Sequence, residues 1–367
     1  MSLKPGPHRR PRRRLLLGLL LLAGLAAAGH ALLWLWLAGR LEAGFRDWAA
    51  LRRAEGWQVD HAAPRRGGWP LAATLTLPDF RLAGGGATLP GGMDWRAEAV
   101  MLRLVPPRLD RLVVEMPGRH GLRLGALELP FAAARLAATL PLEAAALPRE
   151  LRLAAERLRL DTPAGPAAAR DATAEIETRS AAPGGEPAVT LRLLAGDVVL
   201  PEAGPAVRVL GRGVARAQLD LDLTGPMLPG HAPAARAEAW RDGGGALALR
   251  GLALRWGPLA ASGDARLTLD EALQPMGAGT LRLEGAGEAV QAAAEAGLLS
   301  RGAAATVRTV LRMLSRQPAD GGPAELELPL LLEDRVLTAA RLPVAELPAW
   351  RWAAVPSLPV ERRPVGP

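Results

Sequence analysis

The first forty residues constrain this chain of 367 residues more than any other segment. A basic head, residues 1–14, carries six positive charges and leads into 24 uncharged residues that begin at Leu15 and end at Ala38. As a helix rising about 1.5 Å per residue, this stretch reaches about 36 Å, enough to cross a hydrocarbon core of roughly 30 Å. The pattern predicts one transmembrane helix over residues 15–38.

The charges that flank this stretch predict its orientation. Six positive charges precede it, whereas one, Arg40, stands at its exit. By the positive-inside rule, the N-terminus lies in the cytoplasm and everything after Arg40 lies across the membrane. We therefore expect a single-pass protein of the inner (cell) membrane with its bulk in the periplasm.

A cleavable signal peptide is the alternative interpretation of the same segment. Residues 26–28 are three alanines that offer a small-residue cleavage site after a shorter apolar run. Hydrophobicity resumes at residues 32–37, so a cleaved product would begin with an exposed apolar tail, and the uncleaved anchor is favoured. Three tryptophans are the predicted membrane-interface residues: Trp34, Trp36 and Trp48.

A second helical pattern follows at residues 39–56. Leu41, Phe45, Trp48 and Leu51 recur at helical spacing, and Gly56 offers a C-terminal stop. The pattern predicts an amphipathic helix that leaves the bilayer and lays its apolar stripe on the start of the exported domain. The alternative is that the stripe lies on the membrane surface.

From Trp57 onward the hydrophobic period changes from 3.6 to 2. In AQLDLDLTG, for example, three leucines up to Leu223 alternate with Asp220 and Asp222, which collects the leucines on one side of a strand. About a dozen such segments are separated by turns rich in glycine and proline. We predict a mainly β periplasmic domain over residues 57–345, built as one or more strongly curved antiparallel sheets.

One stretch of this domain breaks the alternation. Residues 288–316 are rich in alanine at helical spacing, which predicts a short helical hairpin near the C-terminus, with Val307 and Leu311 on its apolar stripe. Six prolines between Pro343 and Pro367 then predict an extended, proline-rich tail over residues 346–367.

Composition excludes several classes of partner and site. The chain has no cysteine, so disulfides and cysteine-ligated metals are excluded. The net charge of +8 is concentrated at the N-terminus, because residues 41–367 hold 38 basic and 37 acidic side chains. A nearly neutral exported part lacks the basic surface of a nucleic-acid-binding protein, so we expect no nucleic-acid partner.

Residues suited to catalysis are scarce. The five histidines, at positions 8, 30, 61, 120 and 231, are not at zinc-ligand spacing, and no serine lies in a G-x-S-x-G motif. Asp220-x-Asp222 resembles a metal-binding motif, but on a strand both carboxylates fall on the solvent side opposite the leucines. We therefore predict no enzyme activity, no catalytic or metal-binding residues and no cofactor.

The layout of the chain resembles a family of anchored envelope proteins from alphaproteobacteria, known as domain of unknown function 2125. The segments that carry the resemblance follow the anchor along nearly the whole chain: RLEAGFRDWAALRRAEGW, GGWPLAATLTLPDFRL, WRAEAVMLRL, DARLTLDEALQPMGAGTLRLEG and LPLLLEDRVLTAARLPVAELP. The family implies no catalytic residues. A more distant, fold-level analogy to AsmA-type envelope proteins implies a β-groove that handles lipid.

Two functions are therefore open at the level of sequence. In the first, part of the leucine face stays uncovered and binds lipid or another apolar ligand for envelope maintenance. In the second, protein covers the whole face, and the chain is a non-enzymatic scaffold or assembly factor for envelope complexes. An envelope hydrolase is the least favoured third reading. Alternation shows that one face avoids water without showing what covers it.

Overall fold

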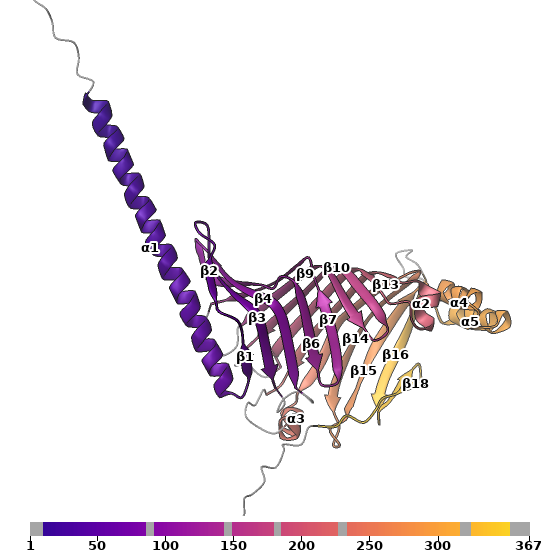
Figure 1. The fold of residues 1–367 in the computed structure, drawn as a ribbon. Helices are drawn as coiled ribbons and strands as arrows, with labels where there is room; N and C mark the ends of the chain where they lie inside the picture. The colour runs from indigo at the N-terminus through magenta and orange to yellow at the C-terminus, as the bar shows by residue number, and fades with distance from the viewer. Residues whose placement is uncertain are drawn as a thin grey trace, which may run out of the picture.

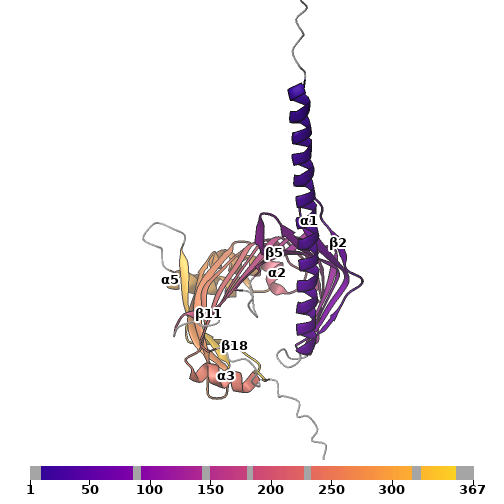
Figure 2. The same cartoon turned by 90° about the vertical axis from the view of Figure 1, so that its left-hand side faces the viewer.

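The computed structural model describes residues 10–85, 92–142, 149–179, 185–226, 233–315 and 324–352. Within these ranges the chain forms five helices and eighteen strands, and all the strand pairs are antiparallel parts of one sheet. Figure 1 shows the first helix, α1, at one end of the sheet and projecting well beyond it, with α4 and α5 at the opposite end. The side view in Figure 2 shows that the sheet is curled. The predicted mainly β, antiparallel and strongly curved fold is confirmed.

Helix α1 runs without a break from Arg10 to Ala54. The sequence predicts two helices here, one over 15–38 and one over 39–56, whereas the structure joins them. Packing explains the continuity, because Leu37, Ala38 and Leu41 on both sides of the expected junction are all buried against the sheet. The predicted stripe is buried at Leu41 and Phe45, while Trp48 and Leu51 remain exposed.

The N-terminal part of the sheet is organised around two long strands, β3 (Ala73–Gly84) and β4 (Met93–Val105), which pair along their whole length. Two short strands, β1 (Gln58–Asp60) and β2 (Arg65–Gly67), pair with the other edge of β3.

The sheet then divides into two branches between β4 and β9. One half of β4 pairs with β5 (Arg108–Glu115), which pairs with β8 (Arg135–Pro141). The other half pairs with β6 (Arg119–Leu124), which pairs with β7 (Leu127–Ala132). Both branches end on the long strand β9 (Glu150–Thr162), which reunites the sheet.

From β9 onward each strand pairs with the strand before it in sequence. These strands are β10 (Gly165–Thr178), β11 (Pro187–Val199), β12 (Gly213–Thr224), β13 (Ala246–Trp256), β14 (Leu259–Leu269), β15 (Pro275–Glu284), β16 (Glu325–Glu333), β17 (Val336–Ala339) and β18 (Leu342–Glu346). The alternating leucines of β12, β15 and β16 are those that predicted strands.

The remaining helices lie between these strands. Helices α4 (Ala286–Glu295) and α5 (Arg301–Leu314) contact each other and form the predicted C-terminal helical hairpin, with the Ser300 hydroxyl capping α5. Two further helices, α2 (Pro205–Leu210) and α3 (Pro233–Asp242), are not predicted by the sequence. Both are short and lie in connections rich in proline or glycine, where no hydrophobic period can develop.

The main hydrophobic core lies where α1 packs on the sheet. It joins the buried face of α1 to β1, β3, β4, β8 and β9, and Leu75 and Leu77 of β3 are fully buried within it. The core is therefore concentrated at the end of the sheet that carries α1.

Candidate functional site

One face of the sheet carries a line of apolar residues, interrupted at Gly263, which has no side chain; we call this line the apolar row. Successive members lie directly opposite each other on neighbouring strands, and opposite residues in antiparallel pairs share a face. The row contains twelve residues on twelve strands: Leu75, Leu102, Val114, Ala138, Leu153, Ala174, Leu193, Leu219, Leu252, Gly263, Leu281 and Leu328. At about 4.8 Å per strand, its contour is about 50 Å long.

Coverage of the apolar row changes along its length. Leu75, at the start, is fully buried beneath α1, and Ala138 is also buried. Leu153 is 36% exposed, and every later member, through Leu328, is only partly buried. Leu102 and Val114 are partly buried as well, but both pack against the main core, which no member from Leu153 onward joins. The row is therefore covered by the main core at the α1 end and partly exposed along β9 to β16.

The opposite face of the sheet is polar and cross-linked by ion pairs. Arg192 pairs with Glu177, and Arg250 on β13 places Nε 2.9 Å from Oδ2 of Asp222 on β12. The Thr190 hydroxyl also donates to Asp222, and the Gln218 side chain donates to Asp220. The Asp220-x-Asp222 motif is thus part of a hydrogen-bonded polar face, opposite the apolar row.

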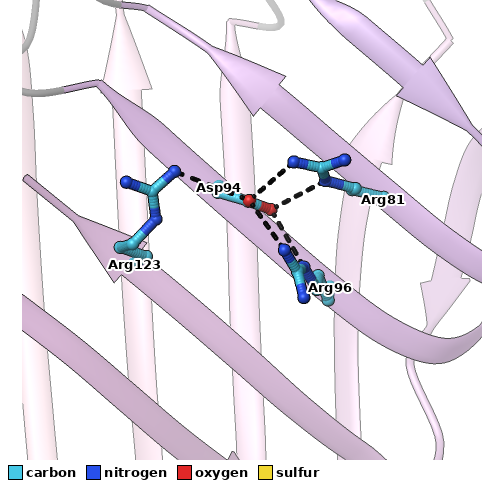
Figure 3. Close-up of polar contacts among 4 residues, drawn as sticks. All are labelled: Arg81, Asp94, Arg96 and Arg123. Carbon is cyan, nitrogen blue, oxygen red and sulfur yellow. Dashed lines mark hydrogen bonds and ion pairs between the residues drawn. The ribbon is translucent and has the colours of Figure 1, made fainter.

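A cluster of three arginines surrounds Asp94 on the same polar face (Figure 3). The Asp94 side chain, on β4, is 3% exposed, and Arg81 of β3 donates to both of its carboxylate oxygens at 2.9 and 3.2 Å. Arg96 donates at 3.2 Å, and Nη2 of Arg123 on β6 lies 3.6 Å away.

These contacts determine the charge of the Asp94 carboxylate. Hydrogen bonds from Arg81, reinforced by Arg96, lower the pKa of Asp94 to about 2, although burial acts in the opposite direction. The carboxylate is therefore ionised at neutral pH and occupied by arginine donors. It ties β3, β4 and β6 together and is not available to transfer protons near neutral pH.

The histidines are separated in the fold. His30 contacts Trp69 in the turn between β2 and β3, and His61 contacts Phe45 of α1. His120 on β6 is buried between the rings of Trp95 and Phe131. Burial lowers the pKa of His120, which favours its neutral form. His8 and His231 lie outside the described residues. No group of three or more metal-ligating side chains occurs in the part of the chain that the structure describes.

The three predicted interface tryptophans occupy different surroundings. Trp34 is half buried and donates from Nε1 to the carbonyl oxygen of Ala72 at 2.9 Å. Trp36 is exposed on α1, with the Arg40 guanidinium 5.5 Å from its ring centroid. Trp48 is stacked on Phe45, about 18 Å beyond Trp36 along the helix.

The structure also brings one unpredicted side chain to this region. Trp69, in the turn between β2 and β3, lies edge-on to Trp34 with ring centroids 5.9 Å apart. The sequence did contain a signal for a functional role of this turn: GGWPLA carries a tryptophan and a leucine, whereas turns usually carry polar residues.

Length and composition of α1 agree with a membrane anchor. The helix from Leu15 onward contains a window with a mean hydropathy of 2.2, and none of that window is buried in the fold. It is long and apolar enough to cross a membrane.

Comparison with known proteins places the chain in a family. No curated protein and no solved structure matches it. The sequence model of one family matches residues 34–348, which include the last five residues of the apolar stretch and the whole described sheet. The chain belongs to this family, described as "Uncharacterized protein conserved in bacteria (DUF2125)".

Proposed function

We propose that this protein is a membrane-anchored envelope protein that holds the acyl chains of lipid on its apolar row. The observation that carries the proposal is the exposure pattern of that row, which extends over twelve strands but is covered by the main core only at its start. Contiguous exposed apolar surface on a protein marks a site for a ligand, a membrane or a partner.

The dimensions of the row favour an elongated ligand. An acyl chain extends through about half of a hydrocarbon core of roughly 30 Å, so a row of about 50 Å accommodates more than one chain end to end. Helices α4 and α5 stand at the end of the sheet opposite α1 (Figure 1), where α4 contacts β14 and α5 contacts β16.

The proposal includes an orientation for the anchor. The basic residues before Leu15 support an N-terminus in the cytoplasm and a sheet in the periplasm, with α1 in the inner membrane. We assign no catalytic step to the chain, because the apolar row carries no reactive side chains and the polar side chains on the opposite face of the sheet form ion pairs.

Site-specific crosslinking tests the proposal. A photoreactive amino acid replaces Leu252, which lies in the open part of the row, or Leu331, which lies on the opposite face of β16 and is exposed. In the full-length protein in its native membrane, we expect lipid adducts by mass spectrometry at position 252 and none at the control position. Equal labelling at both positions, or none at either, would contradict lipid binding on the row.

A scaffold function is the second candidate, and one observation favours it. Strand β18 lies at the edge of the sheet, all five of its residues are exposed, and β17 is its sole partner among the described strands. Free edge strands can pair with another chain. Photo-adducts to a protein at position 252, in place of lipid, would favour this function.

A further inference from the structure

The turn between β2 and β3 presents two large apolar side chains to its surroundings. Trp69 is 51% exposed and Leu71 is 79% exposed. The turn is closed by a hydrogen bond from the Ala72 amide to the Gly68 carbonyl oxygen at 2.9 Å. We call residues 68–72 the hairpin tip.

Three residues of the hairpin tip contact α1. Nε2 of His30 lies 2.7 Å from the Pro70 carbonyl oxygen, and Trp34 donates to the Ala72 carbonyl oxygen. The Trp69 ring centroid lies 5.0 Å from that of His30 and 5.9 Å from that of Trp34. The position of the tip along α1 is therefore defined by residues 30–34 of the helix.

That position can be compared with the depth of a membrane. Because Arg14 is charged, the hydrocarbon core begins no earlier than Leu15. A core of roughly 30 Å takes about 20 helical residues, so it ends no earlier than about residue 35, and a tilted helix moves this limit further along the chain. His30 and Trp34 both precede the limit. The hairpin tip beside them therefore lies at membrane depth.

The charge of Arg66 lies on the other side of this limit. Arg66, in β2, pairs with Glu42 of α1 at 2.7 Å. Glu42 is about 18 Å beyond His30 along the helix. The hairpin is thus apolar where it meets the span and charged where it meets the aqueous side, as expected of a segment that crosses a membrane interface.

We propose that the hairpin tip inserts into the leaflet on the side of the folded domain, with Trp69 and Leu71 in contact with lipid. The inference rests on the proposed membrane span of α1, and it adds a second membrane contact made by the sheet itself. Strand β3 begins at Ala73, directly after the tip, and Leu75 starts the apolar row. The insertion therefore holds the beginning of the row against the bilayer.

Single-cysteine labelling measures the depth of the tip, because the natural chain contains no cysteine. Three full-length variants, Leu71→Cys, Leu22→Cys and Leu342→Cys, each carry a nitroxide in nanodiscs of phosphatidylethanolamine and phosphatidylglycerol. Leu22 lies in the span, and Leu342 is an exposed leucine of β18, at 68%, that matches Leu71 in exposure. Collision rates are measured with molecular oxygen, which concentrates in lipid, and with a water-soluble nickel chelate.

We expect the ratio of oxygen to nickel collisions to be several-fold higher at position 71 than at position 342, and to approach the ratio at position 22. A water-like ratio at 71 with a lipid-like ratio at 22 would overturn the insertion and leave the anchor intact. A water-like ratio at 22 would overturn the anchor and the insertion together. Shielding of position 71 from both reagents would show that protein covers the tip, which also overturns lipid contact.

Discussion

Asp94 is the residue whose charge most clearly stabilises the sheet. It is buried, it accepts hydrogen bonds from two arginines and lies near a third, and its pKa is lowered to about 2 from an ordinary value of 3.8. Because the folded state favours the ionised form, the stabilisation is complete above about pH 4 and is lost as the pH falls through about 2. The carboxylate therefore contributes to stability at neutral pH and not in strong acid.

Replacing this carboxylate tests its contribution. Asp94→Asn keeps the size of the side chain but removes the charge, so we expect a loss of about 1–3 kcal/mol in the free energy of unfolding at pH 6. The difference from the natural chain should shrink as the pH approaches 2. Chemical denaturation followed by circular dichroism gives both values. Asp264→Asn, which removes a largely exposed carboxylate 3.6 Å from Arg282, is the control and should cost less than about 1 kcal/mol.

At the scale of elements, the apolar row predicts an uneven response to mutation. Leu75→Ala removes a fully buried side chain beneath α1, so we expect a loss of about 2–5 kcal/mol. Leu252→Ala truncates a partly exposed member of the same row and should cost clearly less, because that side chain is already partly accessible in the folded protein. Thermal unfolding of the full-length protein in detergent compares the two.

The comparison also has an outcome that contradicts the proposed open face. If Leu252→Ala destabilises the protein as strongly as Leu75→Ala, the two leucines are equally covered and the row is closed. Added phospholipid should raise the unfolding temperature of the natural chain, and the Leu252→Ala variant should show a smaller increase.

The elements differ in how far the sequence could predict them. Strands such as β12 and β16 were predictable because leucines at alternate positions have one strong structural meaning. The division of β4 between β5 and β6 was not predictable, because no local pattern shows which half of a long strand each of these partners pairs with. The continuity of α1 through Gly39 depends on packing against β3, which no local pattern records.

The candidate site was predictable to a similar, partial degree. Alternation predicted that one face avoids water, and the register shows that the face is a single row over twelve strands. The exposure of the individual residues in the row could not be predicted, since it depends on where α1 packs on the sheet. Trp34 was singled out by its place at the end of the apolar stretch, whereas its contact with the hairpin tip joins residues 38 positions apart.

At the scale of the whole molecule, the orientation of the anchor can be tested directly. A reporter that is active only in the periplasm, fused after Pro367, should be active, and a reporter that is active only in the cytoplasm should be silent. The full-length mass should persist in the inner-membrane fraction. Recovery of a soluble product that begins near Gly29 would contradict the anchor and support a cleaved signal peptide.

The neighbour-to-neighbour pairing from β9 to β18 has a consequence for the order in which the protein is assembled. If the N-terminus stays in the cytoplasm, the chain crosses the membrane from the anchor onward, so the strands of the main core emerge early and each later strand finds its partner already in place. All members of that core precede Val199, the last residue of β11. A chain stopped after Val199 should therefore already contain a protease-resistant unit in the membrane, whereas one stopped after Val105 should be digested up to the bilayer. On that basis the last seven strands, β12 to β18, extend a folded unit that is complete without them. Hairpins could therefore be gained or lost at the C-terminal edge of the sheet while the end that packs on α1 stays unchanged.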